Sequence, residues 1–205
     1  MSKRLLRLLL ILIILSGLKL HAQGFKYGLE AGFDVANSDV TGFLSSGRMY
    51  YPMISYNING YLGYKINGLI GVSIEPGLIQ KGGLEKGNPD FRVQNNYIQI
   101  PLLIDYFIND KFYLSLGPEF AYLINAKAKS TNKTNDITKY YDRRNELSGL
   151  IGINYNIYKG FDIGLRYNHG LTYYSKVDLV NENGDKVGEV KEYNQYFQLI
   201  LRIKI

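Results

Sequence analysis

The chain contains no cysteine, no tryptophan and only two histidines, His21 and His169, among its 205 residues. The absence of cysteine excludes disulfide bonds, thiolate metal ligands, cysteine catalysis and acylation of an N-terminal cysteine. Two histidines exclude a zinc site built from three. The sequence also lacks a Gly-rich phosphate loop, a cluster of metal ligands and a nucleic-acid-binding motif. It therefore predicts no cofactor, no metal and no nucleic-acid partner.

Long apolar runs are also absent, except near the N-terminus, where Leu8 to Leu15 is unbroken. This run follows a basic start and is shorter than the about 20 residues that a membrane-spanning helix needs. Ala22 then precedes Gln23, a small residue at the expected cleavage point. The pattern predicts a secretory signal peptide over 1–22, and one mature domain over 23–205.

The formal charge of +6 comes largely from this leader. The whole chain has 24 basic and 18 acidic residues, and four of the bases but no acid lie in the leader. The mature balance is therefore 20 against 18, or +2. A basic, nucleic-acid-binding character is not supported. The four leader bases are Lys3, Arg4, Arg7 and Lys19.

The mature part shows period-two alternation of apolar and polar residues, which is typical of β-strands. At the C-terminus, for example, Phe197, Leu199 and Leu201 alternate with Gln198, Ile200 and Arg202. No stretch here is long and apolar enough to predict a transmembrane helix. The expected strands are 25–36, 53–66, 69–82, 96–108, 111–124, 146–157, 160–175 and 193–205.

Short turns and long loops alternate between these eight strands. Tight turns are expected at Asn67-Gly68, Asn109-Asp110 and Tyr158–Gly160. Both chain ends then lie on the short-turn side, which predicts an all-β, eight-stranded antiparallel transmembrane β-barrel. Pro76 and Pro118 fall inside expected strands, where we expect bulges or local breaks. The long loops are expected at 37–52, 83–95, 125–145 and 176–192.

Side-chain volume indicates which face of the sheet points outward. A secreted lipocalin-like barrel of the same size would place its apolar face inside. One parity here carries bulky apolar residues, whereas the other carries glycines and polar groups, and a narrow eight-stranded interior accommodates only the second set. Tyrosines also gather at both ends of the hairpins, as in the aromatic girdles at membrane interfaces. The apolar face is therefore predicted to meet lipid.

The inward parity carries six acidic and six basic residues: Glu30, Asp34, Glu75, Asp105, Glu119 and Asp162, and Lys26, Lys65, Lys81, Arg166, Arg202 and Lys204. Glu30 and Arg202 lie on the first and last strands, which are neighbours when the barrel closes. A buried charge without a partner costs about 3–5 kcal/mol, so we expect pairing. A selective pore would need an open lumen or charges of one sign. Five residues at similar depth are predicted to form a structural charge network that closes the lumen: Glu30, Glu75, Asp105, Arg166 and Arg202.

The loops hold the remaining candidates for binding. Six basic residues in 125–145 are candidates for contact with lipopolysaccharide phosphates or an acidic partner, the alternative being an ordinary solvated surface. The stretch 177–190 is predicted to be a hairpin whose rim could add a strand to a partner protein. The sequence does not distinguish a monomer from an oligomer. The six residues are Lys127, Lys129, Lys133, Lys139, Arg143 and Arg144.

Catalysis has little support. His169 is the only histidine of the mature chain, and the alternation places it on the lipid-facing parity. No serine–histidine–acid arrangement follows from its neighbours. The sequence therefore predicts that the protein is not an enzyme, and a lipid-modifying enzyme is the least favoured alternative.

Two motifs carry a family resemblance. The stretch Glu75–Gly83 contains a "GL…KGG" strand end, and Tyr97–Tyr106 contains "IPLL". Together with Gly117-Pro118 and Gly164–Tyr167, they resemble the PorT-type outer-membrane β-barrel family of Bacteroidetes. The resemblance implies an eight-stranded barrel in the outer membrane and no catalytic site. The founding member is tied to a protein secretion machine, but family membership alone does not transfer that role.

These observations predict a small outer-membrane barrel with a salt-bridged lumen. It would act structurally, or as an interaction or adhesion module through its extracellular loops, in contact with outer-membrane lipid and lipopolysaccharide. A small-solute porin, or an accessory component of transport or secretion, is the alternative.

Overall fold

The computed structural model describes residues 24–42 and 50–205, so the expected signal peptide over 1–22 lies outside the described residues. Within the described ranges, all strands belong to one antiparallel sheet of twelve strands. This confirms the predicted all-β antiparallel class. The strands are β1 (Phe25–Gly42), β2 (Tyr50–Tyr51), β3 (Met53–Lys65), β4 (Ile70–Ile74), β5 (Gly77–Glu85), β6 (Asn88–Phe107), β7 (Phe112–Ser130), β8 (Lys133–Asp136), β9 (Asn145–Tyr158), β10 (Phe161–Gly170), β11 (Ser175–Val180) and β12 (Lys186–Lys204).

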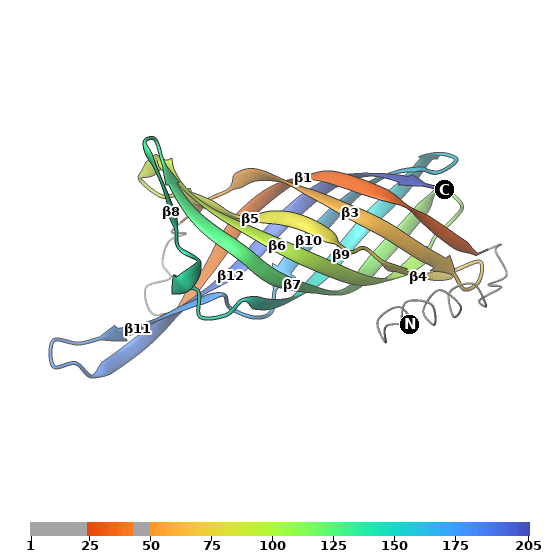
Figure 1. Cartoon of the computed structure of the whole chain (residues 1–205). Helices are drawn as coiled ribbons and strands as arrows, with labels where there is room; N and C mark the ends of the chain where they lie inside the picture. Colours follow the sequence, from red (N-terminus) through yellow and green to blue (C-terminus); the bar gives the residue numbers. More distant parts are fainter. Residues whose placement is uncertain (1–23, 43–49) are drawn as a thin grey trace, which may run out of the picture.

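Strand pairing returns to its starting point. β1 pairs with β3 on one side and with β12 on the other. From β3 the pairing continues through β4 and β5 to β6, then to β7, β9, β10 and back to β12. In Figure 1 these tilted strands wind around a common axis. The closed path leaves no free edge along the ring, and its interior is bounded by backbone on every side.

Several strands run further than the sequence predicts. β1 continues to Gly42, β7 to Ser130, and β12 already begins at Lys186. Ladder pairs such as Thr41 with Lys191 hold these extensions together, because main-chain pairing does not require an apolar face. The expected loops 83–95 and 125–145 are therefore largely hairpins, and the hairpin predicted over 177–190 is confirmed by the pairing of β11 with β12. The extensions and the short β2, β8 and β11 project from one end of the ring (Figure 1).

Proline interrupts one expected strand and not the other. β4 ends at Ile74 and β5 begins at Gly77, which confirms the predicted break at Pro76. Pro76 has no N–H to donate, but its carbonyl accepts the Gly60 N–H at 2.8 Å. Pro118 stays within β7 and pairs with Gly149 of β9, but the ladder between β6 and β7 has no pair at Gly117 and Pro118, which agrees with the local break predicted there.

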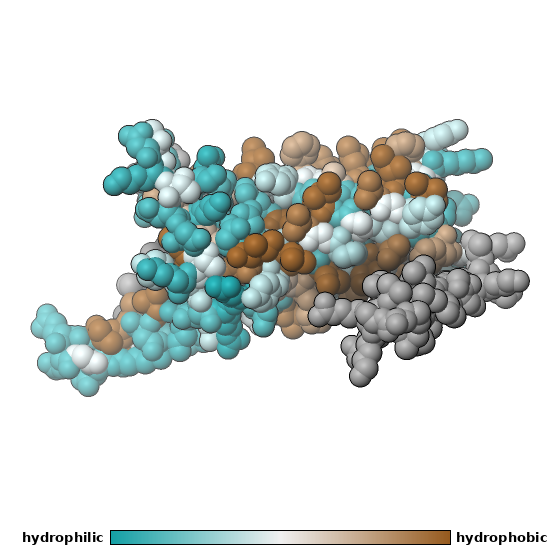
Figure 2. All heavy atoms as spheres, viewed as in Figure 1, coloured by the Kyte–Doolittle hydropathy of each residue, from teal (hydrophilic) through white to brown (hydrophobic). Residues whose placement is uncertain are grey.

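The two faces of the sheet are reversed relative to a soluble protein. Large apolar side chains point outward, with Ile54 78% and Phe33 69% exposed, whereas polar side chains are buried inside. Figure 2 shows these apolar residues as a band between hydrophilic ends. The predicted outward orientation of the apolar parity agrees with this exposure. Further members of the band are Leu29, Ile58, Ile104, Leu116, Ile151, Leu165, Leu199 and Leu201.

The short turns lie at the end opposite the projecting hairpins (Figure 1). Gly160, in the turn between β9 and β10, has a φ of 83°, which a residue with a side chain rarely adopts. Exposed aromatic residues such as Phe25, Tyr106 and Phe161 lie near these turns. No helix in the described ranges has the length and apolar character required to cross a membrane.

Candidate functional site

Four charged side chains meet inside the ring near its middle. Glu30 comes from β1, Glu75 from the break between β4 and β5, Arg166 from β10 and Arg202 from β12, and each is at most 3% exposed. We call these four residues the quartet. Arg166 donates to Glu75 at 2.6 and 2.9 Å and to Glu30 at 3.2 and 3.3 Å. Arg202 donates to Glu30 at 2.7 and 3.0 Å and to Glu75 at 2.5 Å. Each carboxylate thus receives hydrogen bonds from both guanidinium groups.

Strand register explains how the quartet assembles. Glu30 and Arg202 lie directly opposite each other on the paired strands β1 and β12. Neutral groups complete their coordination, because Asn59 donates to Glu30 at 3.0 Å and Arg202 donates to the Tyr113 hydroxyl at 2.8 Å. Arg202 also lies 4.1 Å from the centre of the Tyr61 ring. Two positive and two negative groups balance, and their hydrogen bonds offset part of the cost of burial.

Four of the five residues predicted for the lumen network therefore come together, and Asp105 does not join them. Asp105 is buried, but it accepts a hydrogen bond from the Ser115 hydroxyl at 2.5 Å rather than from either arginine. Its strand, β6, pairs with β7, and Ser115 is its direct register partner. The prediction is corrected at this residue because strand tilt displaces residues that have equal sequence distance from their turns.

A second charged cluster lies nearer the projecting hairpins. Lys81 of β5 contacts Glu119 of β7 at 3.0 Å and Glu146 of β9 at 2.8 Å. We call these three residues the triad. Tyr196 donates to Glu119 at 2.5 Å, and Asn194 donates to Glu146 at 2.6 Å. The triad holds two acids and one base, so neutral donors supply part of its stabilisation.

Sequence reasoning placed Lys81 and Glu119 inside but missed Glu146, which stands at the edge of its expected strand. Glu146 lies two and four residues before the buried Ser148 and Leu150, and this period of two is the signal that identifies it as inward-facing. Of the predicted inward bases, Lys26, Lys65 and Lys204 line a hollow of about 480 Å³ at the short-turn end, where Lys26 and Lys65 are exposed. Among the described residues, seven acids and three bases are buried inside: Glu30, Asp34, Glu75, Asp105, Glu119, Glu146, Asp162, Lys81, Arg166 and Arg202.

The six basic residues predicted for anion contact do not form one patch. Lys127 and Lys129 lie half-buried on β7, and Lys133 is exposed at the start of β8. Lys139, in the single-turn helix η1 (Thr138–Tyr140), lies over the Tyr140 ring at 4.9 Å. Arg143 instead lies 4.3 Å from the centre of the Tyr173 ring, beyond β10. Arg144 is exposed in the same link to β9.

One acidic residue among these bases is electrostatically perturbed. Asp136 on β8 is the register partner of Lys127. Hydrogen bonds from Thr138 lower the pKa of Asp136 below its usual value, and the charges of Lys127 and Arg144 lower it further. Part of the basic excess in this region is therefore compensated locally.

The projecting β11–β12 hairpin carries an exposed ion-pair cluster. Lys176 and Lys186 contact Glu189 at 3.0 and 3.2 Å, and Lys191 also pairs with it. These hydrogen bonds, with that of Lys191 the strongest, lower the pKa of Glu189 to about 2. Within the described residues, β11 forms a ladder with β12 alone, and on its other edge the Lys176 N–H donates to Asp142 at 2.7 Å.

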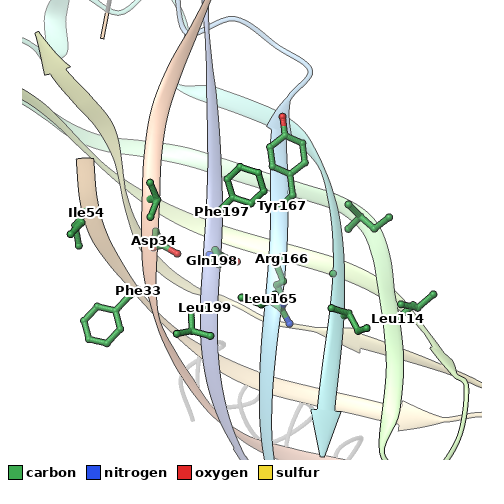
Figure 3. A pocket seen from close by; sticks show the side chains of 14 residues that line it. Phe33, Asp34, Ile54, Leu114, Leu165, Arg166, Tyr167, Phe197, Gln198 and Leu199 are labelled. Atoms are coloured by element: carbon green, nitrogen blue, oxygen red, sulfur yellow. The ribbon is translucent and has the colours of Figure 1, made fainter. Parts of the chain in front are cut away.

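The outer wall of the ring carries an apolar groove of about 940 Å³. Figure 3 shows Phe33, Leu165, Phe197 and Leu199 around it, on β1, β10 and β12. A second hollow of about 300 Å³ adjoins the groove. It shares three residues with the groove, Val35, Tyr167 and Phe197, and adds the polar Asn37 and Gln195.

His169 lies at this polar border. Its Nδ1 is 3.3 Å from the Tyr167 hydroxyl, which is also 3.3 Å from Gln195 Oε1. In the part of the chain that the structure describes, no group of three or more histidine, cysteine or acidic residues has the geometry to hold a metal ion.

Comparisons with known proteins give one family and several similar structures. The family described as "Outer membrane protein beta-barrel domain" matches residues 21–174. No curated protein matches the chain significantly. Ail, the attachment invasion locus protein of Yersinia pestis, has a TM-score of 0.50 at 14% identity, over 89% of this chain and all of Ail (100%).

Two further solved structures are similar at lower scores. Neisserial surface protein A has a TM-score of 0.49 at 18% identity, over 89% of this chain and 98% of that one. OprG from Pseudomonas aeruginosa has a TM-score of 0.46 at 13% identity, over 89% of this chain and 96% of that one. At such low identity, the likeness to Ail concerns the fold.

Proposed function

Because the chain belongs to the outer membrane protein beta-barrel domain family, we propose that it is an eight-stranded outer-membrane barrel that acts as an interaction or adhesion module. In this proposal β4 and β5 form one interrupted wall strand, and β2, β8 and β11 are additions above the membrane. Residues 1–22 are the signal peptide that directs export. The family match supports the location in the outer membrane.

The quartet is the observation that carries this proposal. Its side chains come from four separate positions around the ring and join in the interior with contacts of 2.5–3.3 Å. The triad forms a second set of ion pairs across the interior, nearer the projecting hairpins. A narrow eight-stranded interior filled at two levels leaves no continuous aqueous path, and solute passage requires one. Function is then assigned to the surfaces outside the lumen.

The β11–β12 hairpin is the part best placed to bind a partner protein. It projects furthest from the ring in Figure 1, and beyond Lys176 the main-chain groups on the outer edge of β11 have no ladder partner among the described residues. Val177 and Val180 are 54% and 62% exposed on this strand. Addition of a partner strand would satisfy the main-chain groups and cover these side chains.

Bilayer conductance tests the closed lumen. The native protein, reconstituted in a planar bilayer, is expected to give no steady current. The Glu75→Ala/Arg166→Ala double variant removes one charge of each sign and is expected to conduct. A steady current through the native protein would contradict the proposal and favour the porin alternative.

Crosslinking in the native membrane tests the interaction surface. A photoreactive residue at Val177 or Val180 is expected to give discrete protein adducts, whereas the same residue at lipid-facing Leu201 is expected to give only lipid adducts. If neither hairpin position yields a protein adduct, the β11–β12 hairpin is not the surface that binds a partner protein. We assign no catalytic role, because the described contacts of His169 are with Tyr167 rather than with a serine or an acid.

A further inference from the structure

The outer wall of β1, β12 and β10 changes character over two successive rows of residues. In one row, Val35, Phe197 and Tyr167 are register partners, and all three line both the groove and the adjoining hollow. In the next row towards the hairpins, Asn37, Gln195 and His169 are partners. The wall therefore passes from apolar to polar within a single step of the alternation.

The polar row contains a buried acceptor with no donor. Asn37 is 6% exposed and lines the hollow, and its Oδ1 has no hydrogen-bond partner among the described residues. A buried carbonyl oxygen without a donor is unfavourable, so a donor from a bound molecule would be favoured there. An amide N–H or a hydroxyl of a ligand head group meets this need.

Positive charge lies further along the wall, beyond the row in which Asp39 pairs with Tyr193. Tyr173 follows the end of β10, and Arg143 and Lys191 lie 4.3 and 5.8 Å from the centre of its ring. Lys191 is partly neutralised by Glu189, whereas Arg143 forms no salt bridge with a described carboxylate. Arg143 is therefore a free guanidinium at the height where a lipid head group lies, and guanidinium groups bind phosphate in a bidentate manner.

The order of these features along the wall matches one class of molecule. We propose that this wall is a specific binding site for a phosphorylated, acylated glycolipid of the outer leaflet, of the lipid A type. An acyl chain lies in the apolar groove, an amide or hydroxyl donates to Asn37 Oδ1, and a phosphate contacts Arg143. This site is independent of the partner assigned to the β11–β12 hairpin.

Lipid retention measured by native mass spectrometry tests the site. The full-length mature protein is purified in a mild detergent and mixed with bis-phosphorylated lipid A, with dephosphorylated lipid A, or with phosphatidylethanolamine. The native protein is expected to retain one bis-phosphorylated lipid A and to bind the other two lipids about tenfold more weakly, the loss expected for one charge-assisted contact. Equal retention of phosphatidylethanolamine would overturn the proposal.

Neighbouring arginines supply a matched pair of variants. Arg143→Gln is expected to weaken retention of lipid A about tenfold and to remove the preference for its phosphates. Arg144→Gln changes the charge equally and is expected to retain lipid A like the native protein, since Arg144 has no contact with Tyr173 in the structure. Equal losses in the two variants would show only general attraction and would overturn the site.

A third variant tests the groove without changing the charge. Val35→Trp fills the hollow that adjoins the groove and is expected to abolish specific retention. Folding of each variant is verified by its heat-modifiable electrophoretic mobility. Full retention of lipid A by folded Val35→Trp would overturn the placement of the lipid on this wall.

Discussion

The quartet and the triad are both buried clusters of charge, but they are compensated in different ways. In the quartet, two arginines face two glutamates, and each carboxylate contacts both cations. In the triad, one lysine serves two glutamates, and Tyr196 and Asn194 provide neutral donors. The quartet is thus neutral by ion pairing alone, whereas the triad carries an excess negative charge that hydrogen bonds must support. The same substitution should therefore have different effects in the two clusters.

The largest effect is expected from Arg202→Ala in the quartet. This change leaves Glu30 and Glu75 with Arg166 alone and removes the donor to Tyr113. Loss of one partner of a buried pair costs about 3–5 kcal/mol. Urea unfolding of the protein in lipid vesicles measures the free energy of unfolding. A loss below about 1 kcal/mol, the range of exposed pairs, would contradict the importance of the quartet.

A smaller loss is expected from Lys81→Met in the triad. The methionine keeps most of the side-chain volume, and both glutamates keep their neutral donors. We expect the free energy of unfolding to fall by about 3 kcal/mol, the low end of the range for a broken buried pair, because the methionine leaves little empty volume and the neutral donors still bond to the glutamates. The same urea titration measures it. A larger loss than that of Arg202→Ala would reverse the comparison.

Glutamate-to-glutamine changes sharpen the contrast further. Glu146→Gln removes the excess charge of the triad and leaves Lys81 paired with Glu119, so we expect a change within about 1 kcal/mol of either sign. Glu30→Gln leaves the quartet with an excess positive charge, and we expect it to cost about 2–3 kcal/mol. If both variants unfold at the same urea concentration, charge balance does not distinguish the clusters.

The smallest effect is expected at the exposed cluster of the β11–β12 hairpin. The pKa of Glu189 is lowered to about 2 in the folded hairpin, below its usual 4.5. A carboxylate with a lowered pKa stabilises the fold above its usual value, and that contribution disappears as the pH falls from 4.5 towards 2. Solvent screening makes it small.

Amide hydrogen exchange of residues 175–191, corrected for intrinsic rates, measures this effect. Exchange is expected to be slightly faster at pH 3 than at pH 6. Glu189→Gln is the control and is expected to show a smaller change, which comes from Asp178, because Lys186 lowers the pKa of that carboxyl as well. A strong acid-induced opening confined to the barrel wall would contradict this assignment.

Alternation along the sequence predicts which side of the wall a residue faces. It therefore identified the apolar outer band and the inward position of Glu30, Glu75, Arg166 and Arg202. The pairing of the first and last strands also predicted the contact between Glu30 and Arg202. These inferences succeed because the period of two is a property of every strand, whatever its neighbours.

Depth and lateral position depend on strand tilt and register, which alternation does not encode. Asp105 was therefore assigned to the lumen network but is bonded to Ser115. The six loop cations were expected in one segment, and they are distributed over β7, β8, η1 and the link to β9. The hairpins over 83–95 and 125–145 were expected to be loops, because polar residues do not reveal a continuous main-chain ladder. The family motifs are short and structural, and they carried no information about the lipid-facing groove.

The separation of Glu30 and Arg202 by 172 positions has a consequence for biogenesis. Nearly the whole polypeptide must be in place before these two residues can meet, because they occupy the first and last strands of the ring in chain order. Until then, Glu30 and Glu75 have only one of their two arginines. Closure of the seam between β1 and β12 is thus coupled to completion of the quartet.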